Sequence, residues 1–289
     1  MSGRVALLHI GPYEGAAALG AVGLYALAWR LMDVSQYFGT RPMQQVWTAE
    51  MYDVYKKPDA RYAFGNFALR LLCVKAFAVL CIAIFSTEIV WTICASDYHD
   101  AAFLIPLFGF RVIFLIFTDQ MNNTFLITRK TQYKFLSASF LLINVLLFMY
   151  FFVPWWGVTG VVLAYICALL PYTMFLYVLT QHFFPVRYPF GRMATLLIIT
   201  ILCYFLSLLC GNGIELNAMT AEEFAKLSRW EKIVDAWNRI QWLSNVAKIG
   251  VLLLWGMFIW FSGVLLPDDK ALAIRVFKRG LQRLQIIHK

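Results

Sequence analysis

The chain has 289 residues, of which 61% are apolar and 17% aromatic but only 14% charged, and its mean hydropathy is +0.68. An average globular protein is about half apolar and about a quarter charged, so this composition excludes an ordinary soluble domain and predicts an integral membrane protein. The formal charge of +9 does not indicate nucleic-acid binding, because the basic residues separate apolar runs instead of forming one polar face.

Seven apolar segments are long enough to cross a bilayer, whose hydrocarbon core requires about 20 helical residues. Trp155 and Trp156 lie in the turn between the fourth and the fifth, and such aromatic pairs are typical of a membrane interface. The sequence therefore predicts an all-α protein with about seven transmembrane helices. In chain order the segments cover residues 15–40, 67–94, 101–124, 135–152, 157–181, 193–210 and 243–266.

Basic residues alternate between the connecting segments. The loops after the second and fourth segments contain no Lys or Arg, whereas the loops after the first, third and fifth are basic. Because short basic loops stay in the cytoplasm, this alternation predicts an amino terminus outside and a carboxyl terminus inside. The basic loop residues are Lys56, Lys57, Arg61, Arg129, Lys130, Lys134, Arg187 and Arg192.

Two further segments have the spacing of amphipathic helices. Residues 213–242 contain a capping box at Thr220 and Glu223, and they are expected to lie on the outer membrane surface. Residues 267–289 form a basic tail that anionic lipid headgroups can hold on the cytoplasmic side. The alternative for both is an ordinary juxtamembrane helix without a specific ligand.

Seven ionisable side chains in or next to the predicted spans are candidates for function, because each costs a few kcal/mol at membrane depth. Several have an ordinary explanation: Arg30 and Asp33, three residues apart, could neutralise each other, and Arg41 could reach the headgroups. Lys75 and Glu88 lie toward opposite ends of the second span and could also reach the headgroups. The remaining two are Arg111 and Asp119 in the third span.

Arg111 lies in mid-span among apolar residues and therefore needs either a partner or a water-filled cavity. Asp119, about two turns away, is its candidate salt-bridge partner. The polar stretch around Asp119, from Thr118 to Thr124, is expected to face a cavity or a neighbouring helix. Cations outnumber anions in the spans, so a cavity lined by Arg30, Arg111, Lys75 and Arg41 would suit a phosphate or pyrophosphate group.

Motifs for catalysis are lacking. The sequence has no Gly-x-x-x-x-Gly-Lys-Ser/Thr phosphate loop, no His-Glu-x-x-His motif and no paired cysteine motif. The four histidines are scattered, and the six cysteines fall mostly in apolar runs, where they are interpreted as small apolar residues. We therefore expect a transport protein without catalytic residues, metal or cofactor.

Residues 3–200 resemble the carboxyl-terminal half of the polysaccharide flippases, the Wzx-like O-antigen and exopolysaccharide translocases of the multidrug/oligosaccharidyl-lipid/polysaccharide exporter superfamily. No single element is specific, but seven occur in the family's order. Phe148, Val161, Val162 and Thr48 depart from the family pattern. The matching residues are Val22 to Arg30, Gln45 to Trp47 with Tyr55 and Lys56, Tyr98 to Ala101 with Ile105 and Pro106, Thr128 to Thr131, Asn144, Val153 with Pro154, and Gly157 to Gly160.

The resemblance implies the fold of one lobe of a two-lobed transporter and the translocation of an undecaprenyl-pyrophosphate-linked oligosaccharide across the bacterial inner membrane. Arg30 and Arg111 would contact the pyrophosphate, with Lys75 and Arg41 as weaker candidates, and Asp33 and Asp119 could couple a proton or sodium ion. The first lobe would come from another polypeptide, from a second copy, or from an upstream part of a longer gene, which is the favoured expectation.

Two alternatives remain. A drug or cation exporter of the same fold would be expected to have an acidic cavity. A non-transporting membrane scaffold that binds a glycosyltransferase or polysaccharide polymerase would leave the charges in the spans as internal pairs.

Overall fold

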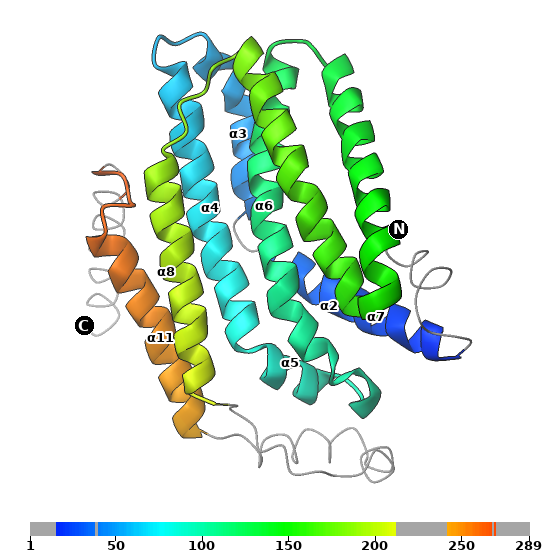
Figure 1. Ribbon diagram of the computed structural model, residues 1–289. Coiled ribbons are helices and arrows are strands. Elements are labelled where there is room, and N and C mark those ends of the chain that lie inside the picture. The colour runs from blue at the N-terminus through cyan, green and yellow to red at the C-terminus, as the bar shows by residue number, and fades with distance from the viewer. Residues whose placement is uncertain (1–15, 38–39, 212–241, 268, 270–289) are drawn as a thin grey trace, which may run out of the picture.

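The computed structural model describes residues 16–37, 40–211, 242–267 and 269, and all regular structure among them is helical (Figure 1). The predicted amphipathic segment 213–242 and the tail 267–289 lie almost wholly outside the described residues. The helices are α2 (Ala16–Tyr37), α3 (Thr40–Tyr55), α4 (Ala60–Ile84), α5 (Ser86–Ile93), the short 3-10 helix η1 (Ser96–Tyr98), α6 (Ala101–Ile127), α7 (Gln132–Phe183), α8 (Phe190–Leu209) and α11 (Trp242–Phe261).

Five helices of the described part are long and apolar enough to cross a membrane: α4, α6, α7, α8 and residues Ser244–Phe261 of α11. Their length and composition are those of an all-helical membrane protein. Apolar side chains on the outer faces of α7, α8 and α11 are exposed, as expected for surfaces that contact lipid. Examples are Leu142, Phe151, Leu209 and Leu253.

Helix α7 is a hairpin, although its 52 residues are helical nearly throughout. As a straight rod it would measure roughly 80 Å, far more than a bilayer. The chain reverses at Gly157, whose φ of 51° and ψ of −123° are not helical. Gly160 lets the two arms approach, because a Cβ there would lie 2.3 Å from the carbonyl oxygen of Phe152. The two arms, side by side in Figure 1, cover the segments predicted at 135–152 and 157–181.

The first two predicted spans differ from the observed helices. The segment expected at 15–40 ends at Tyr37, and a second helix, α3, begins at Thr40. Pro42 lies in the first turn of α3, where its missing N–H is tolerated. A helix that arrived from the preceding residues could not continue through this proline. The segment expected at 67–94 begins earlier, at Ala60, and breaks at Phe85 between α4 and α5.

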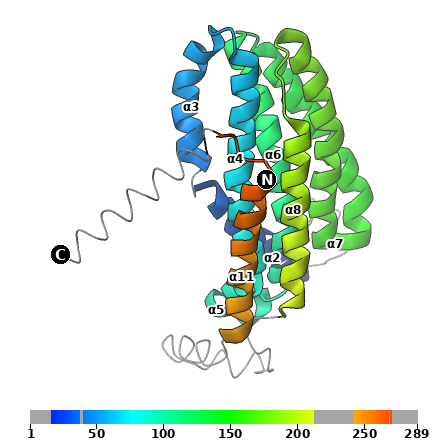
Figure 2. The ribbon, with the colours of Figure 1, turned by 90° about the vertical axis from the view of Figure 1, so that its left-hand side faces the viewer.

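Helix α6 is at the centre of the bundle and packs against α2, α4, α5 and α7. Its buried face includes Ile105, Phe108 and Val112, each of which is at most 1% exposed. Helix α2 crosses the bundle obliquely, whereas α3 runs beside α4 (Figures 1 and 2). Helix α11 packs against α8, where the Trp255 indole N–H donates to the Thr200 hydroxyl at 2.9 Å.

The basic turns gather at one end of the bundle (Figure 1). The backbone N–H of Arg187 donates to the carbonyl oxygen of Arg61 at 3.2 Å, and the Lys130 ammonium lies 3.8 Å from the Phe183 ring centroid. Gly65 permits this approach, because a Cβ there would lie 2.1 Å from the Arg187 carbonyl oxygen. The turn of α7 and the segment before α6 lie at the opposite end.

Candidate functional site

Arg111 projects from α6 into a cluster of aromatic rings and is 7% exposed. Its guanidinium carbon lies 3.7 Å from the Trp29 ring centroid and 4.9 Å from that of Tyr165. Attraction between a cation and an aromatic face is strengthened when water is excluded, and Trp is the strongest partner. Sequence reasoning missed these rings as partners of Arg111, because they lie on α2 and α7.

Four rings form this aromatic cluster: Tyr25 and Trp29 on α2, Phe108 on α6 and Tyr165 on α7. Tyr25 and Trp29 are four residues apart and therefore project from one face of α2. The Phe108 ring contacts both edge-on, at centroid distances of 5.3 Å and 6.0 Å, and Trp29 meets Tyr165 at 6.2 Å. Three helices thus fix the position of the Arg111 guanidinium.

Asp33 is joined to the same cluster through Trp29, whose indole N–H donates to the carboxylate at 2.7 Å. Two expected pairings are therefore not formed. Arg30 is exposed and makes no ion pair with Asp33, and Arg111 makes none with Asp119 in the part of the chain that the structure describes. Trp29 takes the place of Arg30 because it lies one turn before Asp33 on the same face.

Lys75 is completely buried, and its ammonium nitrogen has no hydrogen-bond partner among the described residues. The expectation that Lys75 reaches the headgroups is wrong, because α4 begins at Ala60 and thereby places Lys75 in its middle. The charges that act on Lys75 come from Asp33, Asp119 and Arg41. A buried ammonium without a close anion is costly, so this position is a candidate binding site.

Glu88 has an ion-pair partner within the protein. It lies on α5, and its carboxylate forms a buried ion pair with Lys248 of α11. Sequence reasoning missed this pair, since the two residues are 160 positions apart and nothing local connects them.

We call Arg41, Lys75, Arg111, Asp33 and Asp119 the charged cluster. Arg41 is exposed and its guanidinium carbon lies 4.1 Å from the Tyr37 ring centroid. The Asp119 side chain is exposed. Lys75 interacts electrostatically with Asp33, Asp119 and Arg41, and Arg111 with Asp33, whereas Arg30 lies on the exposed face of α2. The cations exceed the anions by one.

Part of the polar stretch of α6 faces the neighbouring helix α7, which is one of the two arrangements expected from the sequence. The Asn122 amide donates to the Tyr172 hydroxyl at 3.3 Å and accepts from the Ser137 hydroxyl at 3.5 Å. The side-chain amide nitrogen of Gln120 and the hydroxyl of Thr124 are buried and have no hydrogen-bond partner among the described residues. These polar groups extend the charged cluster toward the basic end of α6.

The charged cluster can bind an anion. A guanidinium that stacks through its face keeps its N–H groups at its edge, where phosphate oxygens can be bound in pairs. No three His, Cys, Asp or Glu side chains gather into a metal-binding group within the described ranges.

No protein-family model matches the chain, and neither do any curated proteins or solved structures.

Proposed function

We propose that this chain is one lobe of a transporter that moves a polyprenyl-pyrophosphate-linked oligosaccharide across the bacterial inner membrane. The observation that carries the proposal is the burial of Lys75 and Arg111 in α4 and α6 with no carboxylate at ion-pair distance in the described residues. Each such charge costs several kcal/mol in a low-dielectric interior, and an anionic cargo offsets that cost when bound.

The cluster suits a pyrophosphate in the sign of its charge. Arg111 presents the edge of its guanidinium, Lys75 adds a compact charge, and Arg41 lies at the exposed margin. Asp33 and Asp119 reduce the total charge to a small excess, which favours release as well as binding. The same two carboxylates are the candidates for coupling transport to a proton or a sodium ion.

An assembly with a further lobe is part of the proposal. Helix α3 lies beside α4, yet it exposes Arg41, Gln45 and Glu50. A polar face cannot contact lipid chains, so it requires water or protein beside it. The basic turns, which gather at one end of the bundle, and the sequence resemblance to the second lobe of polysaccharide flippases support this arrangement.

The two rivals explain the charges less well. An exporter of organic cations would need an excess of carboxylates, whereas this cluster has an excess of cations. A scaffold would hold its charges as internal pairs. Glu88 and Lys248 are such a pair, but Lys75 and Arg111 are not.

The test is binding of a short polyprenyl diphosphate to the purified chain in lipid nanodiscs. Farnesyl diphosphate is titrated against the wild type, Arg111→Ala and Lys75→Met, with farnesol as the ligand that lacks phosphate. We expect each substitution to weaken binding of the diphosphate at least tenfold and to leave farnesol unaffected. Arg192→Ala, at an exposed residue at the start of α8, is the matched control and should bind as the wild type.

Equal binding by all variants, or equal binding of diphosphate and alcohol, would exclude this function for the cluster. Tighter binding of a lipophilic cation, abolished by Asp33→Asn and Asp119→Asn, would favour the cation exporter.

A further inference from the structure

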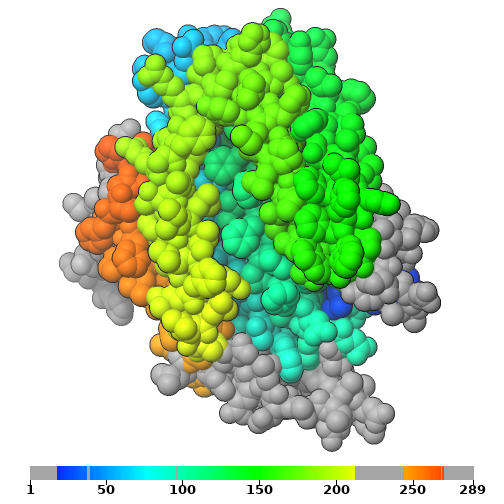
Figure 3. Space-filling model, viewed as in Figure 1, coloured from blue at the N-terminus to red at the C-terminus, as the bar shows by residue number. Residues whose placement is uncertain are grey.

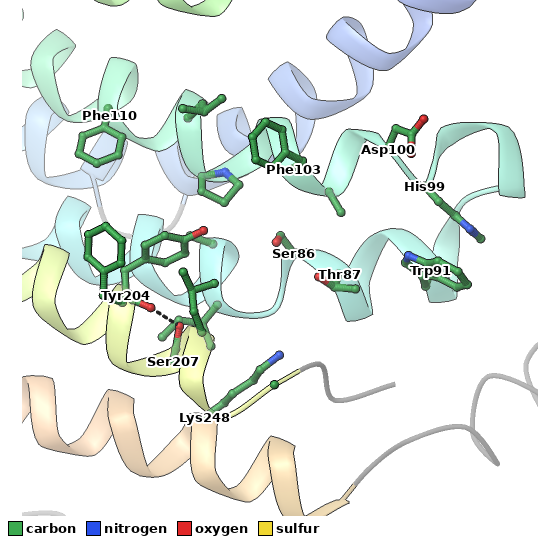
Figure 4. Close-up of a pocket in the computed structure, with 18 residues that line it drawn as sticks. Ser86, Thr87, Trp91, His99, Asp100, Phe103, Phe110, Tyr204, Ser207 and Lys248 are labelled. Carbon is green, nitrogen blue, oxygen red and sulfur yellow. Dashed lines mark hydrogen bonds between the residues drawn. The ribbon is translucent and has the colours of Figure 1, made fainter. Parts of the chain in front are cut away.

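A cavity, which we call the head pocket, lies at the end of the bundle opposite to the basic turns, between α5, α6, α8 and α11. Its volume of about 570 Å³ is in the range of small-molecule sites. None of the residues in the charged cluster lines it. Figure 4 shows Ser86 and Thr87 of α5, Tyr204 and Ser207 of α8 and Lys248 of α11 facing Phe103 and Phe110 of α6 across this head pocket.

The head pocket continues into a shallow, almost wholly apolar groove of about 40 Å³ between α4, α6 and α8. Ala83, Pro106, Phe110 and Tyr204 line both spaces, and the groove extends along Ile113 and Ile201. In Figure 3, α6 is visible at the floor of a furrow beside α8. We call this the lateral groove. A site that joins a polar pocket to an apolar groove fits an amphiphile better than a water-soluble molecule.

The charges of the head pocket indicate which headgroup it fits. Lys248 and Asp100 line it from α11 and from the start of α6. Because Glu88 already meets the charge of Lys248, and Asp100 adds a negative charge, the pocket has no excess of positive charge for an anionic headgroup. The Asp100 carboxylate is suited to the ammonium of a zwitterionic headgroup, and the N–H and O–H donors of Lys248, Ser86 and Thr87 are suited to its phosphate.

The position of the head pocket along the bundle axis also fits a lipid headgroup. It lies where α4 and α8 end and α6 begins, and Trp91 lines it. Trp side chains are enriched at the headgroup level of a bilayer. A lipid with its headgroup here would run its chain toward the middle of the bundle along the lateral groove.

We propose that the head pocket and the lateral groove bind one zwitterionic phospholipid, with its headgroup between Lys248 and Asp100 and one acyl chain between α6 and α8. This site is separate from the charged cluster, so the proposal does not depend on the transport function.

The test uses the purified chain in nanodiscs that contain phosphatidylethanolamine with a diazirine near the end of one acyl chain. After illumination, the labelled peptides are identified by mass spectrometry. We expect labelling to concentrate on α6 and α8 near Phe110 and Ile201, and unlabelled phosphatidylethanolamine to compete at least fivefold better than phosphatidylglycerol. Labelling spread evenly over the exposed face of α7 would overturn the proposal.

Two variants that obstruct the site test whether the labelling depends on it. Thr87→Trp fills the head pocket and Ile201→Trp fills the lateral groove, and each should lower the labelling of α6 and α8 at least fivefold. Their controls place the same side chain on the neighbouring exposed surface of the same helix, Thr92→Trp and Leu202→Trp, and should leave labelling unchanged. Unchanged labelling in a folded Ile201→Trp protein would refute the site, and equal competition by phosphatidylglycerol would refute the assigned headgroup.

Discussion

The ion pair between Lys248 and Glu88 should contribute strongly to the attachment of α11. The two side chains are only 4% and 12% exposed. Removing one partner from such a pair leaves a buried charge without compensation, which costs about 3–5 kcal/mol. We therefore expect Lys248→Met to lower the free energy of unfolding by about that amount. Titration of the detergent-solubilised protein with sodium dodecyl sulfate, followed by circular dichroism, measures this difference.

Two further variants separate the charge effect from a loss of packing. Lys56→Met removes the partner of Asp53 in an exposed pair whose side chains are 75% and 80% exposed, and it should cost at most about 0.5 kcal/mol. The double variant Glu88→Met with Lys248→Met leaves no buried charge and should recover most of the lost stability. If Lys248→Met costs no more than Lys56→Met, or the double variant is less stable than the single one, the reasoning is refuted.

Two more predictions concern the turn of α7 and the segment before α6. Gly157→Ala places a side chain at a φ of 51° and should lower the free energy of unfolding by about 1–3 kcal/mol, measured by the same titration; an unchanged value contradicts the hairpin geometry. Burial lowers the pKa of His99 below its ordinary 6.5, with Asp97 and Asp100 opposing this only in part. Because the unfolded chain then binds the proton more readily, stability should fall as the pH drops through about 6.5. His99→Gln should reduce that fall, and an identical pH profile would show that His99 does not cause it.

The helical class and the membrane character follow from composition and run length, which report directly on burial in lipid. The points where the chain bends depend on single residues. Gly157 lies at the turn that Val153-Pro154-Trp155-Trp156-Gly157 predicted, whereas the break before Pro42 and the bend at Phe85 carry a weaker local signal.

The charged cluster was accessible to sequence reasoning only in part. Arg111 stands out because it interrupts an apolar run, and Asp33 lies one turn from Trp29. The stacking of Arg111 on Trp29 and the electrostatic interaction of Lys75 with Asp33 and Asp119 depend on how α2, α4 and α6 cross. Such crossings are set by packing between distant segments, which no local pattern encodes.

The most direct test is an experimental structure of the chain in nanodiscs with a bound polyprenyl diphosphate. The account predicts phosphate oxygens within hydrogen-bond distance of the Arg111 guanidinium and the Lys75 ammonium, with the Trp29 stack retained. Phosphates found only at the basic turns, with Lys75 and Arg111 satisfied by water or by carboxylates, would contradict it.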